Sequence, residues 1–138
     1  MSLELLAPVI AAALLGILAL GVRVQHRRQA ELVGRAVGGA AEHEVPQLLY
    51  FTGVACAICH AAQRPAVTRL AVGVGDAAVI REIDVAEQPE LARRYRVMTL
   101  PTTVVLRPDG VVAAVNVGFA GDTVLRAQLV EAGLRLAA

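Results

Sequence analysis

One uninterrupted apolar segment near the N-terminus constrains this chain more than any other feature. From Leu5 to Val22 the sequence holds only Leu, Ala, Val, Ile, Gly and one Pro, over about 18 residues. A helix of that length rises ~27 Å, close to the ~30 Å hydrocarbon core of a bilayer. The segment also lacks the polar face that a helix packed on a soluble core shows. We therefore predict an N-terminal transmembrane anchor over residues 1–24, a connector over 25–46 and one soluble domain over 47–138.

A cleaved signal peptide is the alternative for this segment. Signal peptides begin with positive charge and end at a cleavage site of the small-x-small type. Here Glu4 and no Lys or Arg precedes the apolar run, and Ala19-Leu20-Gly21 matches the cleavage pattern poorly. These features favour a permanent anchor.

The charges that flank the anchor predict its orientation. Arg23, Arg27, Arg28 and Arg35 all follow the apolar run, whereas no Lys or Arg precedes it. Positively charged residues next to a membrane span stay in the cytoplasm. We therefore expect a single-pass protein of the cell membrane, with its C-terminal domain in the cytoplasm.

Charge and cysteine content exclude two broad classes of protein. The formal net charge is +1 and no long basic run occurs, so the electrostatic footprint of a nucleic-acid binder is absent. The two cysteines lie three positions apart, too close to staple a small secreted fold. They indicate a local chemical site instead.

Beyond Pro46 the apolar pattern becomes that of a small α/β domain. Short apolar or β-branched runs predict strands, and apolar residues at helical spacing predict helices. The expected strands span residues 47–52, 77–85, 102–106 and 111–117, and the expected helices span 57–72, 89–95 and about 122–136. Pro65 should kink the first of these helices, and Asp122 or Thr123 should cap the last. The order β-α-β-α-β-β-α implies parallel pairing through crossovers, with the final hairpin adding an antiparallel strand.

The two cysteines occur in the sequence Cys56-Ala57-Ile58-Cys59, between the first predicted strand and the first predicted helix. Backbone N–H groups and the helix dipole at such a position favour a thiolate over a thiol. Cys56, at the exposed end, is expected to attack a substrate disulfide. Cys59, one turn later, is expected to resolve the mixed disulfide, because residues at i and i+3 of a helix are neighbours.

A second motif, Thr99-Leu100-Pro101-Thr102, leads into the third predicted strand. Together the two motifs resemble the thioredoxin family, whose members carry C-x-x-C at the start of the first core helix. They also carry a cis-proline before the third strand, facing the cysteines. Further matching positions are Tyr50-Phe51, Asp84, Tyr95, Asp109-Gly110 and Gly118.

This resemblance covers roughly residues 45–137 and implies a thioredoxin-like α/β fold, a mixed sheet with flanking helices. It implies protein disulfides or thiols as substrates, exchanged through the Cys56/Cys59 dithiol, and a separate reductant donor. It also implies a substrate groove lined by Thr99, Leu100 and Pro101, with Pro101 as the cis-proline. No cofactor and no metal is expected.

The motif departs from the family's usual W-C-G-P-C site at several positions. Ala55 stands in place of the Trp, and Ala57-Ile58 in place of Gly-Pro. Tyr50 occupies the place of the buried acidic residue, and Pro65 falls one residue later than the family's helix proline. These differences bear on the redox potential, the rate and recognition by a dedicated reductase rather than on the fold.

Three other interpretations remain open for the cysteines. Followed by His60, they match the C-x-x-C-H pattern of c-type haem attachment, with Met98 as an opposite ligand. A predicted hairpin over residues 102–117 and a cytoplasmic domain both disfavour haem. Zinc is disfavoured because Cys56, Cys59 and His60 supply at most three ligands, where a structural site needs four. The domain could also be an interaction module that keeps the fold with idle cysteines.

Overall fold

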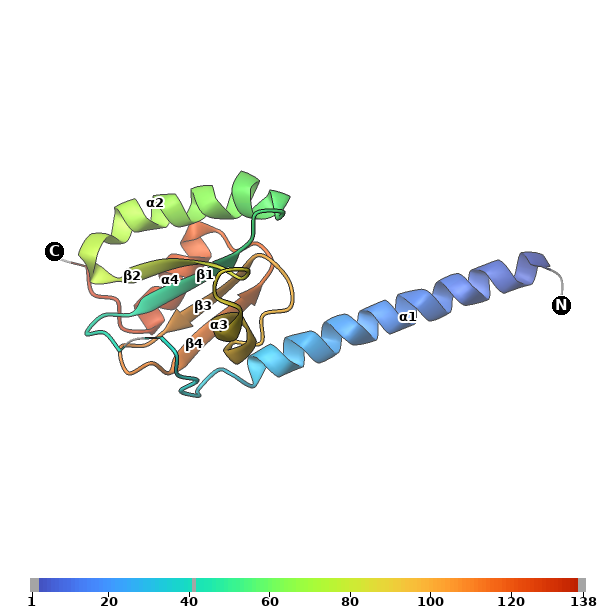
Figure 1. The fold of residues 1–138 in the computed structure, drawn as a ribbon, viewed down its shortest axis with the longest axis horizontal. Helices are drawn as coiled ribbons and strands as arrows, with labels where there is room; N and C mark the ends of the chain where they lie inside the picture. The colour runs from blue at the N-terminus through green and yellow to red at the C-terminus, as the bar shows by residue number, and fades with distance from the viewer. Residues whose placement is uncertain (1–2, 41, 137–138) are drawn as a thin grey trace.

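A computed structural model describes residues 3–40 and 42–136 of the chain. Helix α1 (Leu3–Ala30) extends far from the α/β domain that the rest of the chain forms (Figure 1). It is long and apolar enough to cross a membrane, and its apolar window is entirely unburied. The predicted candidate span is therefore a continuous helix, which runs on past Val22 for two further turns.

Four strands form one mixed sheet in the order β2-β1-β3-β4. The strands are β1 (Gln47–Thr52), β2 (Val79–Asp84), β3 (Thr102–Leu106) and β4 (Val112–Val117). Strand β1 pairs in parallel with β2 and antiparallel with β3, and β3 pairs antiparallel with β4. Every residue of the two central strands β1 and β3 is buried, as their continuous apolar sequences predict. The predicted thioredoxin-like α/β fold with a mixed sheet is confirmed.

The direction of β3 differs from our expectation of parallel pairing. Phe51 pairs with Thr102, so β3 begins at the end of the sheet where β1 finishes. The helix before it, α3 (Pro89–Arg94), has six residues and rises only ~9 Å, about half the length of a six-residue strand. Because this helix does not return the chain to the opposite end, β3 runs back along β1.

Helices cover both faces of the sheet (Figure 1). Helices α2 (Arg64–Val74) and α4 (Asp122–Glu131) pack on one face, whereas α3 and the segment that follows α1 pack on the other. Alternate residues of β1 point into the two layers: Leu48 and Tyr50 into the first, Leu49 and Phe51 into the second. The domain thus has two apolar cores separated by the sheet.

The helix expected over residues 57–72 contains an irregular turn. Cys59–Gln63 is π-helical, and the Arg64 N–H bonds to the Cys59 carbonyl before α2 begins. Pro65 lies in the first turn of α2, where its missing N–H breaks no helical hydrogen bond. The expected kink therefore takes the form of a wide turn immediately after the cysteines.

Helix α4 is shorter than expected at its C-terminal end, and its cap differs. Gly121 is the N-cap and no side-chain cap forms, so neither Asp122 nor Thr123 has the predicted role. Gly133 adopts a φ of 108°, and the Leu134 N–H bonds back to the Leu129 carbonyl. A glycine in this left-handed region followed by such a bond ends a helix.

The segment after α1 is packed onto the domain. Leu32 is buried in the second core layer. The Gly34 N–H bonds to the Val112 carbonyl at 2.8 Å, and the Val112 N–H bonds to the Arg35 carbonyl at 2.9 Å. The predicted connector is thus fixed along the start of β4 over these residues.

Candidate redox site

Cys56 and Cys59 lie where the chain leaves β1 and enters its first helical turn. The two residues form a disulfide, with their Cα atoms 5.3 Å apart. Cys59 is fully buried, whereas Cys56 is partly exposed and packs at the edge of the first core layer. Only one of the two sulfur atoms is therefore placed for contact with another molecule.

Backbone groups stabilise the site around Cys56. The Cys59 N–H donates to the Cys56 sulfur across 3.3 Å, and the Cys56 N–H bonds to the Gly53 carbonyl. A backbone N–H directed at a sulfur at the start of a helix favours the thiolate form of that sulfur once the disulfide is reduced. The expected difference between an exposed and a buried cysteine thus has a structural basis.

Tyr50 contacts the redox site from the core side. Its side chain is fully buried, and its hydroxyl donates to the Cys59 carbonyl at 3.1 Å and bonds with the Thr52 hydroxyl at 3.2 Å. Burial raises the pKa of Tyr50, so the phenol stays neutral and acts as a donor, not as a base. The sequence placed Tyr50 before the motif, at the position of the family's buried acidic residue, and did not indicate this contact.

The segment Thr99–Pro101 lies at the same end of the sheet as the cysteines. The Leu100–Pro101 peptide bond is cis, and Pro101 is buried while Leu100 is half-buried. Leu100 and Cys56 together line an open groove of about 480 Å³; the other lining residues are Gly53, Val54, Ala55, Asp84, Val85 and Ala86. Of the three residues expected to line a substrate groove, Thr99 and Pro101 are not among the lining residues of this one. The Thr99 hydroxyl accepts a hydrogen bond from Gln25 of α1.

His60 is held by neighbours on both ring nitrogens. Its Nε2 lies 3.2 Å from the Val54 carbonyl, and its Nδ1 lies 3.1 Å from the Arg64 guanidinium. These partners select the neutral tautomer with the proton on Nε2. Hydrogen bonding to Glu82, together with its charge, raises the pKa of Arg64, which keeps the guanidinium protonated.

The structure gives the haem and zinc interpretations no support. The cysteines are joined to each other, and Met98 lines a cavity beside α1 that does not include His60. In the described part of the chain, no group of three His, Cys, Asp or Glu side chains could hold a metal ion.

A mixed α/β sheet with a disulfide-forming cysteine pair at the start of its first core helix defines a thiol–disulfide oxidoreductase. The sequence profile of the thioredoxin family matches residues 39–131. The chain therefore belongs to the thioredoxin family, as its motifs predicted.

Solved thioredoxins show the same fold. Thioredoxin-2 of the malaria parasite, a component of its protein secretion machinery, superposes with a TM-score of 0.62 at 23% identity, covering 68% of this chain and 89% of that one. Chloroplastic thioredoxin z gives 0.58 at 20% identity, covering 64% and 79%. Mitochondrial thioredoxin 3 of Saccharomyces cerevisiae, in its oxidised form, gives 0.54 at 26% identity, covering 62% and 77%. A comparison with curated protein sequences finds no match.

Proposed function

We propose that this chain reduces protein disulfides at a membrane surface, with Cys56 as the attacking thiolate and Cys59 as the resolving thiol. The observation that carries the proposal is the unequal placement of the two sulfurs. Cys56 is exposed to the groove and receives a backbone N–H, whereas Cys59 is 0% exposed. An intermolecular attack needs the accessible sulfur, and an intramolecular resolution needs only the neighbouring one.

The exchange balances without any cofactor. The Cys56 thiolate attacks one sulfur of the substrate disulfide, the substrate S–S bond breaks, and a substrate thiolate leaves. The Cys59 thiol loses its proton to water and attacks the Cys56 sulfur, which releases the second substrate thiolate. Two electrons pass to the substrate and the chain is left as the Cys56–Cys59 disulfide, the form that the structure contains. A dithiol donor then returns it to the reduced state by the reverse exchange.

Leu100 is the proposed backbone contact for an extended substrate. The Thr99 carbonyl already accepts the Thr102 hydroxyl at 2.8 Å, and the Pro101 carbonyl accepts the Gly118 N–H. Within the described residues the Leu100 N–H and carbonyl make no hydrogen bond. Pairing of these two groups with a substrate strand would lay its disulfide along the groove beside Cys56.

The membrane location rests on α1. Its apolar, unburied helix supports a single-pass anchor, and the arginines after Val22 favour a cytoplasmic C-terminal domain. Fusion of alkaline phosphatase or a fluorescent protein to the C-terminus tests the orientation. A fluorescent fusion with inactive phosphatase is expected, and active phosphatase would reverse the assignment.

The redox role is tested with the full chain in lipid nanodiscs and a short disulfide-bonded peptide in solution. The reduced wild-type chain should reduce the peptide, and Cys56→Ser should abolish the reaction. Cys59→Ser should accumulate a mixed disulfide between Cys56 and the peptide. A reduction potential near about −270 mV supports a reductase, whereas one near about −120 mV would indicate an oxidant. An unreactive wild-type chain would leave only a binding domain with idle cysteines.

A further inference from the structure

Helix α1 is joined to the domain by side-chain contacts in its last two turns. The Gln25 side-chain amide donates to the Thr99 hydroxyl at 3.1 Å. The Gln29 amide donates to the Arg96 carbonyl at 3.3 Å, and Gln29 is only 2% exposed. These contacts join α1 to the loop that leads into Pro101.

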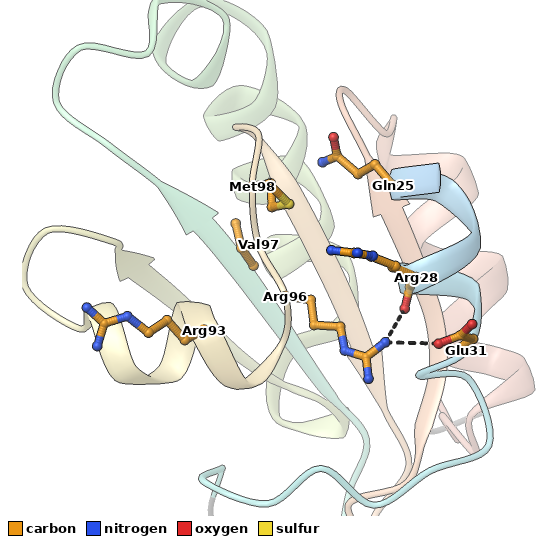
Figure 2. A pocket seen from close by; sticks show the side chains of 7 residues that line it. All are labelled: Gln25, Arg28, Glu31, Arg93, Arg96, Val97 and Met98. Atoms are coloured by element: carbon orange, nitrogen blue, oxygen red, sulfur yellow. Dashed lines mark hydrogen bonds and ion pairs between the residues drawn. The ribbon is translucent and has the colours of Figure 1, made fainter. Parts of the chain in front are cut away.

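Arg96 adds a second set of contacts at this junction between α1 and the loop that leads into Pro101. Its guanidinium donates to the Arg28 carbonyl at 2.9 Å and pairs with the Glu31 carboxylate at 3.1 Å, as the dashed lines in Figure 2 show. Figure 2 also shows the Arg28 side chain pointing toward the loop that carries Val97 and Met98. With the burial of Leu32 described above, these bonds fix the direction of α1 relative to the domain.

The junction places the loop before Pro101 close to the end of the apolar helix. Gln25 is three residues beyond Val22, where the apolar run ends, which corresponds to a rise of ~4.5 Å. Met98 and Thr99 also line a cavity of about 750 Å³ beside α1; the helix residues in it are Ile17, Leu18, Leu20, Gly21, Val22, Val24, Gln25 and Arg28. Met98 is 70% exposed, and it shares this cavity with Val22, at which the apolar run ends.

The redox site is at this same end of the domain. The strand register brings the end of β1 beside the start of β3 and the start of β3 beside the end of β4. Figure 1 shows α1 leaving the domain on the side where β1 ends and α2 begins. Among the described residues, the loops and the first helical turn at this end expose the large apolar side chains of Val54, Ile58, Met98 and Phe119.

We propose that the redox site faces the bilayer and exchanges disulfides with a second integral membrane protein, whose cysteine pair lies at the membrane surface. This inference rests on the proposed function and names the partner class for the same site. A membrane beneath the domain obstructs a soluble globular substrate, whereas a cysteine pair just beyond a partner's membrane span meets Cys56 directly. The exposed apolar side chains at this end suit a partner surface at the interface rather than bulk water.

Two synthetic single-span peptides test the partner class with the full chain in nanodiscs. Both carry one disulfide-bonded Cys-x-x-Cys pair, placed next to the apolar span in the near peptide and about 12 helical residues, ~18 Å, beyond it in the far peptide. The wild-type chain should reduce the near peptide at least tenfold faster than the far one. Equal rates would overturn the proposal.

A matched variant moves the redox site away from the membrane without changing any residue of the site. Insertion of seven polar, helix-forming residues after Val22 raises the domain by ~10 Å above the membrane. Because seven residues make almost two helical turns, the domain keeps nearly the same rotation about the axis of α1. The variant should lose the preference for the near peptide and still reduce a small soluble disulfide peptide at the wild-type rate. A preference unchanged by the insertion would overturn the proposal. If the wild-type chain reduces none of the three substrates, the result contradicts the proposed function itself rather than the class of partner.

The orientation of the domain relative to the bilayer can be tested without an activity assay, by measuring how accessible spin labels on the domain are to water. In the oxidised chain a nitroxide can be attached at Met98→Cys, with Val72→Cys as the control. Val72 is 84% exposed and lies about 13 residues, ~20 Å, along the helical region from Cys59. The label at position 98 should be several-fold less accessible to a water-soluble nickel relaxant than the label at position 72. Equal accessibility of the two labels would overturn the proposed orientation.

Discussion

The hydroxyl of Tyr50 donates a hydrogen bond to the carbonyl oxygen of Cys59 across 3.1 Å, beneath the redox disulfide. This bond joins the central strand to the irregular turn after the cysteines. Tyr50→Phe removes the donor while keeping the ring, so we expect a loss of about 0.5–1.5 kcal/mol in the free energy of unfolding. Urea denaturation of the oxidised chain measures it.

Tyr95→Phe is the matched control for this substitution. Tyr95 is 1% exposed, and within the described residues its hydroxyl makes no hydrogen bond. Its replacement should change the free energy of unfolding little. An equal loss in both variants would show that the Tyr50 bond contributes nothing specific.

The two tyrosines also predict an alkaline transition. Burial raises the pKa of both phenols above 10.0, so their neutral forms contribute stability that is fully present below about pH 10. That stability should be lost as the pH rises through the higher folded values. Because the chain has 2 Tyr and no Trp, tyrosinate absorbance near ~295 nm reports only these groups.

The folded chain should show little tyrosinate absorbance at about pH 10, where the chain unfolded in urea is about half ionised. A folded chain that titrates like the unfolded one would contradict the burial of both rings.

Burial of Cys59 predicts selective alkylation of the reduced chain. With iodoacetamide, Cys56 should react at least tenfold faster than Cys59, because only Cys56 faces the groove. Mass spectrometry of the digested chain assigns the modified residue. Cys56→Ser should therefore protect the chain from rapid alkylation, whereas Cys59→Ser should not. Rapid reaction of Cys59 in wild type would remove the basis for its resolving role.

Gln63 fixes the loop after β4 to the turn that follows the cysteines. Its fully buried side chain donates to the Ala120 carbonyl and accepts the Ala120 N–H, both at 2.9 Å. Gln63→Ala leaves two buried backbone groups without these partners, so we expect a loss of about 2–4 kcal/mol in the free energy of unfolding. Within the described residues, the Gln128 side chain bonds only the half-buried Asn116, so Gln128→Ala should cost less. The ranking of the two variants by denaturation tests the role of Gln63.

The sequence predicted those features that depend on local pattern. Strands β1 and β3 have the bounds expected from their apolar and β-branched runs, and the cysteine pair followed from its spacing and context. The direction of β3 did not follow, because it depends on how far the helix before it carries the chain. The sequence also predicted a last helix that runs to about residue 136, whereas α4 ends at Glu131, before the left-handed turn at Gly133.

The polar contacts between residues far apart in the chain could not be predicted, because they leave no recognisable pattern in the sequence. Gln25 and Thr99 are 74 positions apart, and neither stands in a periodic run that marks it as a contact residue. From the sequence, Arg28 indicated only the orientation of the anchor, and no pattern marked Arg96 as a contact residue. Only the folded chain shows that these side chains join the apolar helix to the loop before Pro101.

The junction between α1 and the domain gives the last prediction. Gln25→Ala combined with Arg96→Ala removes the bond to Thr99 and the bonds to Arg28 and Glu31. The domain should then turn more freely on α1, so a nitroxide at position 98 should become several-fold more accessible to the water-soluble relaxant. Reduction of the far peptide should also rise toward that of the near one.

Arg93→Ala is the matched control for the double variant. Arg93 lines a second cavity together with Gln25 and Arg96 of the junction (Figure 2). Within the described residues its guanidinium bonds only Glu90 of its own helix α3. Because this exposed pair does not cross the junction, its removal should leave both the accessibility at position 98 and the peptide preference at wild-type values. If the double variant behaves like Arg93→Ala, the bonds of Gln25 and of the Arg96 guanidinium do not hold the orientation. The bond from Gln29 to the Arg96 carbonyl and the packing of Leu32 would then have to hold it.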